Sequence, residues 1–367
     1  MERTHYLRRE QAQRRTAIFV ALFVLSTVLI AGIVGAVAGL VLNQRALEAF
    51  EVGGFQAALA QFDPQVAAMA AGAIALVIAV TAIFRLISFG GDGAKVAQSL
   101  GAIEVPADTR NPLKQRYLNV VEESAIAANM PVPRAFVLKH EKGINAFAAG
   151  ADPEHAAIGV THGALSSLTR SELAGVVAHE MAHIANRDTQ LNIRIMALVF
   201  GLVAVYVLGR MALRGALISS MGRRSRDARA QMLMLAVGVV VIAVGALGIL
   251  GGRIMQAAIS RQREYLADAT GASYTGDPQG LANALKKIGA LGRQGRVNNG
   301  HAEEARHMMF VNAAAHHSMS GPFSTHPPLI ERIRALDPQF DPDTDPVWRE
   351  DQKTMMREAR PWGRPAP

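Results

Sequence analysis

"VVAHEMAHIANRD", residues 176–188, places two histidines four positions apart with a glutamate directly after the first. Residues four apart lie on one face of a helix, so the imidazoles of His179 and His183 can bind one zinc ion. Glu180 then lies close enough to act as general base on a water held at the same ion. Composition alone would produce this pattern by chance in roughly 1–2% of such chains. The competing interpretation is an alanine-rich helix with two surface histidines.

A catalytic zinc site needs a third protein ligand and an open position. The best candidate lies in "SRQREYLADAT", residues 260–270, where Glu264 and Asp268 are again four apart. We expect Glu264 to bind the metal and Asp268 to accept a hydrogen bond from a ligand histidine, which fixes the tautomer of that ring. Asp188, five residues after His183, is predicted to support the same site; the alternative is that it only caps the end of the helix.

The composition favours membrane helices over an oversized soluble core. Of the 367 residues, 50% are hydrophobic but only 5% are aromatic. The absence of cysteine excludes disulfides and thiolate metal sites, so any metal must be bound by His, Asp or Glu. The formal charge of +8 comes largely from arginines beside apolar runs, and no basic stripes alternate with aromatics. We therefore expect a lipid bilayer as partner and no nucleic acid.

Two uncharged runs near the N-terminus, residues 16–42 and 66–84, predict a transmembrane hairpin over residues 16–89. The segment 1–15 before the hairpin is strongly basic, and the connecting loop carries one arginine against three acidic residues. By the positive-inside rule, the basic N-terminus stays in the cytoplasm and the loop lies outside. The chain is therefore expected to return to the cytoplasm near Arg85.

Two later apolar runs, residues 195–209 and 232–252, predict a second hairpin over residues 195–252, either transmembrane or re-entrant. The first run would be about 22 Å long as a helix, short of the roughly 30 Å hydrocarbon core. The loop between the runs holds six arginines against one aspartate, which the positive-inside rule disfavours outside the cell. In either arrangement the hairpin returns the chain to the side that it left.

The mostly polar residues 90–194 and 253–336 are predicted to form the two parts of one catalytic domain. A helix is expected over 112–128, with Pro112 in its first turn. A second helix is expected to begin at Thr169, because Thr169-Arg-Ser-Glu172 has the spacing of a capping box before an apolar run.

Short runs bounded by glycine and proline predict three strands, at residues 135–138, 146–149 and 157–160. The tail, 337–367, is polar and rich in proline and charge, so we expect it to be loosely ordered. The predicted fold class is α+β and mainly helical, a catalytic domain with a small β-sheet on an integral-membrane helical scaffold.

The segment "NAFAAG", residues 145–150, has the small side chains of an edge strand. Such an edge can bind an extended polypeptide by β-augmentation, which recognises main chain more than side chains. The predicted substrate strand comprises Asn145, Ala146, Phe147 and Ala148. An ordinary edge strand without this role is the alternative.

Five motifs follow one another along the chain: "GINAFAAG" at 143–150, "IGVTHGAL" at 158–165, "VVAHEMAHIANRD" at 176–188, "SRQREYLAD" at 260–268 and "STHPPLIERI" at 324–333. In this order they resemble the membrane-bound zinc metallopeptidases of the HtpX type, relatives of the CAAX prenyl endopeptidases. The likeness extends from about Leu118 to Asp337 and includes the N-terminal membrane hairpin. One departure is "HMMFVNA" from His307, where the family would have a more aromatic stretch.

The resemblance implies a gluzincin-like catalytic domain in which His179, His183 and Glu264 hold one zinc ion and Glu180 is the general base. It also implies a cytoplasmic active site in a bacterial inner membrane, and a role in degrading misfolded membrane proteins. A histidine at the position of His326 approaches the site in that family, so we predict it as a second donor to the oxyanion. The alternative is a turn in which Pro327 and its neighbour start a helix.

Three other functions compete with a quality-control protease. A catalytically silent membrane scaffold or chaperone is disfavoured because it would have no chemical need for Glu180. A transporter is disfavoured because the apolar runs carry no acidic residues. A specific processing protease stays open, and the oligomeric state is not predicted.

Overall fold

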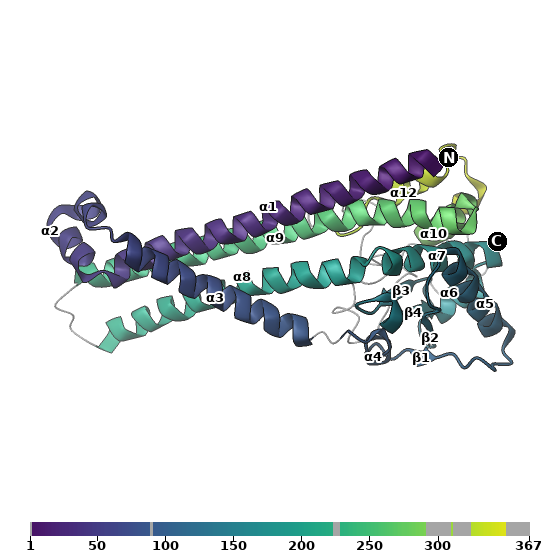
Figure 1. Ribbon diagram of the computed structural model, residues 1–367, viewed down its shortest axis with the longest axis horizontal. Helices are drawn as coiled ribbons and strands as arrows, with labels where there is room; N and C mark the ends of the chain where they lie inside the picture. Colours follow the sequence, from purple (N-terminus) through teal and green to yellow (C-terminus); the bar gives the residue numbers. More distant parts are fainter. Residues whose placement is uncertain (1, 89–90, 223–227, 291–309, 311–323, 350–367) are drawn as a thin grey trace, which may run out of the picture. The chain divides into compact units, whose positions relative to one another are not determined.

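The computed structural model describes residues 2–88, 91–222, 228–290, 310 and 324–349. The chain forms two compact units, each built from segments distant in sequence (Figure 1). The unit that we call the apolar unit comprises Arg14–Phe89 and Ile193–Gln256. The other, the polar unit, comprises Met1–Gln13, Gly90–Asn192 and Ala257–Pro367.

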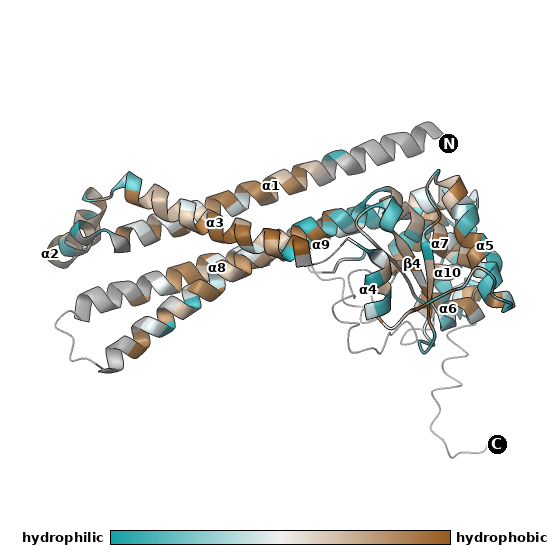
Figure 2. Cartoon of the chain, turned by 60° about the horizontal axis from the view of Figure 1, so that its bottom comes forward, coloured by the Kyte–Doolittle hydropathy of each residue, from teal (hydrophilic) through white to brown (hydrophobic). Residues whose placement is uncertain are grey.

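Long helices make up the apolar unit, and three of them continue into the polar unit. The helices are α1 (Glu2–Leu42), α2 (Gln44–Ala60), α3 (Pro64–Ser88), α8 (Asp188–Gly222) and α9 (Ala228–Thr275). Hydrophobic residues cover long stretches of α1, α3, α8 and α9 (Figure 2). Many of them face outward, for example Leu25 and Leu29 of α1, which are 63% and 62% exposed. Helices that expose leucine to this extent suit a lipid environment rather than water.

Within the described residues, four helical stretches are long and apolar enough to cross a membrane. They are Ala17–Val37, Pro64–Ile87, Asp188–Gly215 and Gly238–Thr275. The third apolar run, 195–209, is part of a longer helix than its 15 uncharged residues indicated. Helix α8 continues through Arg210 to Gly222 and has 35 residues, about 52 Å of helix.

Small residues let α1 and α3 pack closely inside the apolar unit. A Cβ at Gly35 would lie 2.4 Å from the Cα of Ala71, and one at Gly39 would lie 2.8 Å from the Cα of Ala67. At these distances no side chain fits at either glycine unless the two helices move apart. Close backbone approach through small residues is a common way for helices to associate in lipid, where the hydrophobic effect does not favour helix association.

The polar unit contains one four-stranded sheet in the order β1-β2-β4-β3. Strands β2 and β4 pair in parallel, and the outer pairs β1–β2 and β3–β4 are antiparallel. The three predicted strands are confirmed. Strand β1 was missed because its two residues are too few to show an alternation of apolar and polar side chains. The strands are β1 (Ile103–Glu104), β2 (Arg134–Leu138), β3 (Ala146–Ala149) and β4 (Ala157–Thr161).

The remaining helices pack around this sheet. They are α4 (Gly93–Ser99), α5 (Pro112–Ala127), the short 3₁₀ helix η1 (Pro153–His155), α6 (His162–Ser167), α7 (Arg170–Ala185), α10 (Pro278–Ala290) and α12 (Leu329–Leu336). Helices α5, α6, α7, α10 and α12 share one apolar core with the sheet, and α4 contributes to a second, smaller one. Both predicted helix starts are confirmed. Pro112 occupies the first turn of α5, and Thr169 forms a complete capping box with Glu172 at the start of α7.

Two contacts fix α7 and α5 in this core. A Cβ at Gly175 of α7 would lie 2.6 Å from the backbone nitrogen of Leu281, so α10 lies directly against α7 at that point. The buried hydroxyl of Tyr117 on α5 donates a 3.0 Å hydrogen bond to the carbonyl of Ile158 in β4. Helix α7, which carries both motif histidines, is thus held between the sheet and α10.

The expectation of a loosely ordered tail is wrong for residues 337–349. Phe340 and Trp348 are buried in the main core, where aromatic surface outweighs the local proline and charge. The buried ammonium of Lys286 contacts Asp337 and Asp345, each at 2.8 Å. The remaining part of the predicted tail, residues 350–367, lies outside the described residues.

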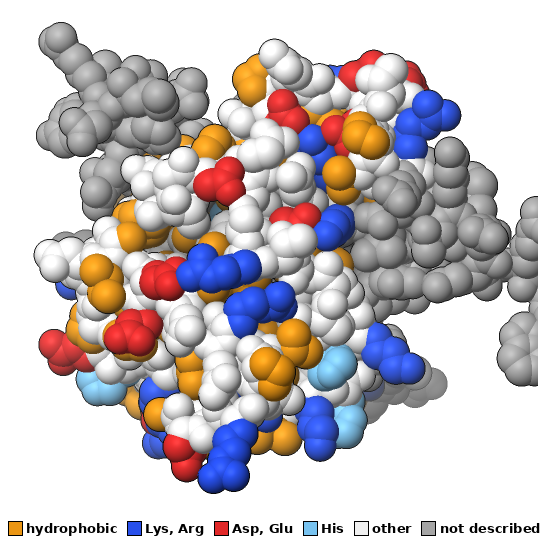
Figure 3. Space-filling model, turned by 90° about the vertical axis from the view of Figure 1, so that its right-hand side faces the viewer, with side chains coloured by type: hydrophobic (Ala, Val, Ile, Leu, Met, Phe, Trp, Pro, Cys, Tyr) orange, Lys and Arg blue, Asp and Glu red, His pale blue; other side chains and the backbone are white. Residues whose placement is uncertain are grey.

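The outer surface of the polar unit mixes acidic and basic side chains on the face that Figure 3 shows, with small hydrophobic groups between them. Interspersed charge of both signs is typical of a surface in contact with water. This part of the chain therefore differs from the apolar unit, where many large hydrophobic side chains face outward.

Candidate metal centre

The centre forms where α9 crosses α7 inside the polar unit. A Cβ at Gly271 of α9 would lie 2.8 Å from the backbone nitrogen of His179, so the two helices touch through their backbones. Glu264 precedes this contact by two helical turns and reaches the face of α7 that carries His179 and His183. The glycine therefore allows two segments about 80 residues apart to share one site.

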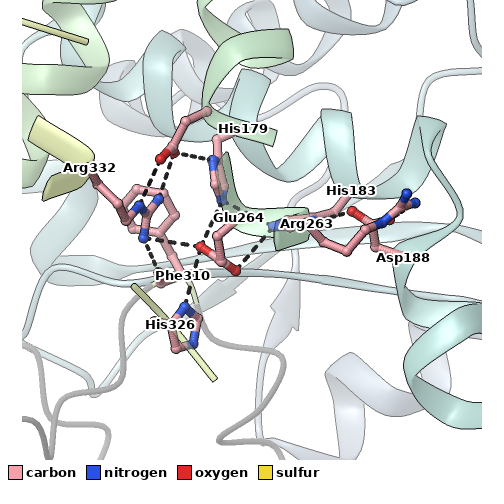
Figure 4. Close-up of polar contacts among 9 residues, drawn as sticks. His179, His183, Asp188, Arg263, Glu264, Phe310, His326 and Arg332 are labelled. Atoms are coloured by element: carbon pink, nitrogen blue, oxygen red, sulfur yellow. Dashed lines mark hydrogen bonds and ion pairs between the residues drawn. The ribbon is translucent and has the colours of Figure 1, made fainter. Parts of the chain in front are cut away.

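The three predicted ligands meet at one point (Figure 4). One atom from each of His179, His183 and Glu264 lies within 4.8 Å of the other two. The two Nε2 atoms are 3.1 Å apart. Oε2 of Glu264 is 3.7 Å from Nε2 of His179, and Oε1 is 3.6 Å from Nε2 of His183. Two imidazoles and one carboxylate are the donor set of many catalytic zinc sites.

A carboxylate holds the far side of each imidazole. Nδ1 of His179 lies 2.9 Å from Oδ1 of Asp268, and Nδ1 of His183 lies 2.7 Å from Oδ2 of Asp188. An ionised carboxylate only accepts, so each Nδ1 carries the hydrogen and each Nε2 presents its lone pair. Two lone pairs facing each other at 3.1 Å need a proton or a cation between them. The residues present therefore fit a metal ion.

The two histidines differ in their affinity for a proton. Against the effect of burial, hydrogen bonds with Asp188 and Glu264 raise the pKa of His183 well above its usual value. Burial lowers the pKa of His179. Without a metal the pair thus holds one proton more readily than two or none, and a metal ion competes with that proton for the same lone pairs.

Glu180 is 2% exposed and lies beside the ligand group on α7. Its carboxyl group accepts a hydrogen bond from the backbone of Ala148 in β3, and burial raises its pKa to about 8. Oε1 has no hydrogen-bond partner within the described residues. A buried oxygen without a partner is costly in a native structure and commonly marks a functional group.

His326 lies in the segment that leads into α12 and contacts the third ligand. Its Nδ1 is 3.3 Å from Oε2 of Glu264, and its side chain is 10% exposed. Neither ring nitrogen makes a well-formed hydrogen bond within the part of the chain that the structure describes. The structure thus brings the predicted histidine to the site, on the side of Glu264.

The predicted substrate strand is an edge of the sheet and is already in contact with other groups. Ala146 to Ala149 are all buried. The carbonyl of Ala146 accepts a 2.8 Å hydrogen bond from the backbone N–H of Phe310. The ring of Phe310 packs edge-on against the ring of His179, with centroids 4.8 Å apart. The edge and the metal ligands therefore border the same space.

Sequence reasoning missed three residues at this centre, Arg263, Phe310 and Arg332. Arg332 was quoted only as part of a motif, and Arg263 only as a neighbour of Glu264. Arginine is rarely buried, so nothing in the spacing marked these two side chains as internal. Phe310 lies in the segment from His307 that departs from the family pattern; the rest of that segment lies outside the described residues.

The model of peptidase family M48 matches residues 112–339. A protease HtpX homolog from Caldanaerobacter subterraneus subsp. tengcongensis is 42% identical over 253 residues, which cover 65% of this chain and 75% of that protein. Another protease HtpX homolog, from Ligilactobacillus salivarius, is 34% identical over 269 residues, 72% of this chain and 84% of that protein. The family match includes strands β2, β3 and β4 and the segments that carry His179, His183 and Glu264.

Proposed function

Because the chain belongs to peptidase family M48 and is a multi-pass membrane metalloendopeptidase of the HtpX type, we propose that it binds one zinc ion through His179, His183 and Glu264. The observation that carries this proposal is the meeting of three donors whose free lone pairs point at one place. The intermediate hardness of two nitrogens and one oxygen favours zinc over magnesium or calcium, which prefer oxygen ligands.

When bound, zinc supplies Lewis acidity that makes a water acidic and polarises the scissile carbonyl. We propose that Glu180 accepts the proton of the attacking water through its unpaired Oε1 and returns it to the leaving amine. His326 is proposed as the donor to the oxyanion, supported by its contact with Glu264 through Nδ1 and by its Nε2, which has no hydrogen-bond partner within the described residues.

We propose that substrate binds in extended form along the outer edge of β3, the edge that does not pair with β4. The support is the register of the sheet, in which Ala146 and Ala148 direct their backbone groups away from β4. The carbonyl of Ala146 accepts a hydrogen bond from the backbone N–H of Phe310. A substrate N–H would take the place of that donor when substrate binds. The backbone of Ala148 bonds to Glu180, so a strand bound at this edge would lie close to the proposed base.

A peptide series tests this endopeptidase function. Alternate amides of an added strand point toward β3, so N-methylation should weaken cleavage at every second position only. Each lost hydrogen bond should cost about 1 kcal/mol, about fivefold in kcat/KM. Scrambled peptides of equal length should be cleaved at comparable rates. The measurement is mass-spectrometric timing of internal cleavage by the full chain in detergent.

The two arms of that series separate the open alternatives. Sequence-tolerant cleavage with a two-residue N-methyl period supports a quality-control protease of misfolded membrane proteins. Cleavage of only one sequence would instead indicate a specific processing protease. If N-methylation were without effect at every position, substrate binding by β-augmentation would be excluded.

We also propose that all four long helices span a bacterial inner membrane and that the polar unit faces the cytoplasm. The support is the length of α8 and α9, together with the basic N-terminus and the acidic loop before α3. Because the chain has no cysteine, single cysteines report topology directly. An impermeant maleimide should label Gln56→Cys and Ser219→Cys in intact cells, but Ser167→Cys only after permeabilisation. Labelling of Ser219→Cys only after permeabilisation would show that α8 and α9 form a re-entrant hairpin.

A further inference from the structure

Two buried arginines lie next to the candidate metal centre, and each contacts the aspartate that is paired with one ligand histidine (Figure 4). Arg332 of α12 donates two hydrogen bonds to Asp268, from Nε to Oδ2 at 2.8 Å and from Nη2 to Oδ1 at 2.7 Å. Arg263 of α9 makes an ion pair with Asp188. Each aspartate in turn contacts Nδ1 of one ligand histidine. The centre therefore contains two chains of the same order, arginine to aspartate to histidine.

We propose that Arg332 and Arg263 are positioning residues, and that each fixes the ring orientation of one metal-binding histidine through an aspartate. The inference rests on the proposed function, since it requires a metal ion at His179 and His183. It goes beyond that function because it assigns the precision of the site to side chains that touch no metal. Helix α12, which carries Arg332, would then contribute to the metal affinity of the centre.

Burial explains why the arginines are needed. Asp268 and Asp188 are 2% and 3% exposed, so each carboxylate needs a partner charge that is buried with it. An aspartate held in place by its arginine stays aligned with the Nδ1–H of its histidine, which supports the tautomer that frees Nε2. The guanidinium fork also fixes the plane of the carboxylate, which a single point charge does not.

The two arginines act at different places. Arg332 has a third contact, from Nη1 to Oε2 of Glu264 at 3.1 Å, and so holds one oxygen of the third ligand as well. Arg263 instead donates a 2.7 Å hydrogen bond to the carbonyl of Asn186 in the turn between α7 and α8. The next residue, Arg187, has a φ of 55°, a left-handed conformation that non-glycine residues adopt rarely. Arg263 thus steadies the turn that presents Asp188, and Arg332 is expected to have the larger effect.

The test is zinc affinity of the full chain in detergent, measured by competition with a fluorescent chelator. Loss of a group that orients a metal ligand should weaken binding, so Arg332→Met is expected to bind zinc about 10–100-fold more weakly than wild type. Arg332→Lys keeps the charge but not the fork and should fall between the two. The matched control is Lys286→Met, which removes another buried cation that contacts two aspartates away from the centre. It should lower thermal stability and leave zinc affinity unchanged.

A double-mutant comparison separates positioning from general destabilisation. The fold-losses of Arg332→Met and Asp268→Asn should combine to well below their product in the double variant, because both break the same chain of contacts and only the contact of Arg332 with Glu264 is additional. The losses of Arg332→Met and Asp188→Asn should multiply, because they act on different histidines. Multiplication in the first pair would overturn the inference.

Two further outcomes are decisive. Wild-type affinity in both Arg332 variants, or an equal loss in Lys286→Met, would overturn the positioning role while leaving the zinc site intact. If wild type and Glu264→Gln bound zinc equally, the proposed function itself would fail. The failure of one proposal is thereby distinguishable from the failure of the other.

Discussion

Glu180→Gln is expected to lower casein cleavage by about 10²–10⁴-fold while leaving zinc bound. Glutamine has the size of glutamate but cannot accept the proton of the attacking water at neutral pH. The side chain is buried and lies beside the ligands without being one of the three converging donors, so the substitution removes proton transfer and little else. The measurement is the initial rate of casein cleavage by the full chain in detergent, with zinc content determined on the same sample.

Glu172→Gln provides a matched control on the same helix. Glu172 is also buried, but it serves the capping box of α7 and an ion pair with Lys287 at 2.8 Å. Glutamine can still cap the helix, so cleavage should continue at close to the wild-type rate. Cleavage by Glu180→Gln at the wild-type rate would exclude the proposed proton transfer.

His179→Ala is expected to abolish zinc binding at the centre, and with it both cleavage and the stabilisation that zinc confers. A metal that binds only the folded chain stabilises it by about 2.7 kcal/mol at a free concentration one hundred times its Kd. Thermal unfolding of wild type should therefore shift upward when zinc is added and downward with a chelator. His179→Ala should show neither shift.

His162→Ala is the control for this experiment. His162 is exposed at the start of α6 and contributes nothing to the ligand group, so this variant should keep the zinc-dependent shift. A zinc-dependent shift in His179→Ala equal to that of wild type would mean that the stabilising metal binds elsewhere.

Local signals in the sequence predicted most of the elements that build the site. The capping box at Thr169 and the proline at the start of α5 act within one helical turn, and the strand runs are short and bounded by glycine or proline. The spacing of four within each ligand helix is equally local. Glu264 was predicted as the partner of these histidines because a catalytic zinc needs a third ligand, and the family resemblance supported that choice. The contact at Gly271 leaves no periodic pattern and was not predicted.

What the sequence did not reveal depends on tertiary contacts. Arg332 and Arg263 are separated by 64 and 75 residues from the aspartates that they bind, and no spacing rule connects them. The length of α8 was underestimated because Arg210 ends the apolar run but not the helix. The burial of Phe340 and Trp348 followed from packing against the core, although two large aromatics in a polar tail were a usable signal.

Zinc content of three purified chains tests the central claim most directly. Wild type, Glu180→Gln and His179→Ala would be washed with a weak chelator in detergent and analysed for metal per chain. One site formed by His179, His183 and Glu264 predicts one zinc per chain in the first two and none in the third. Equal zinc in all three, or active wild type without bound metal, would contradict the account.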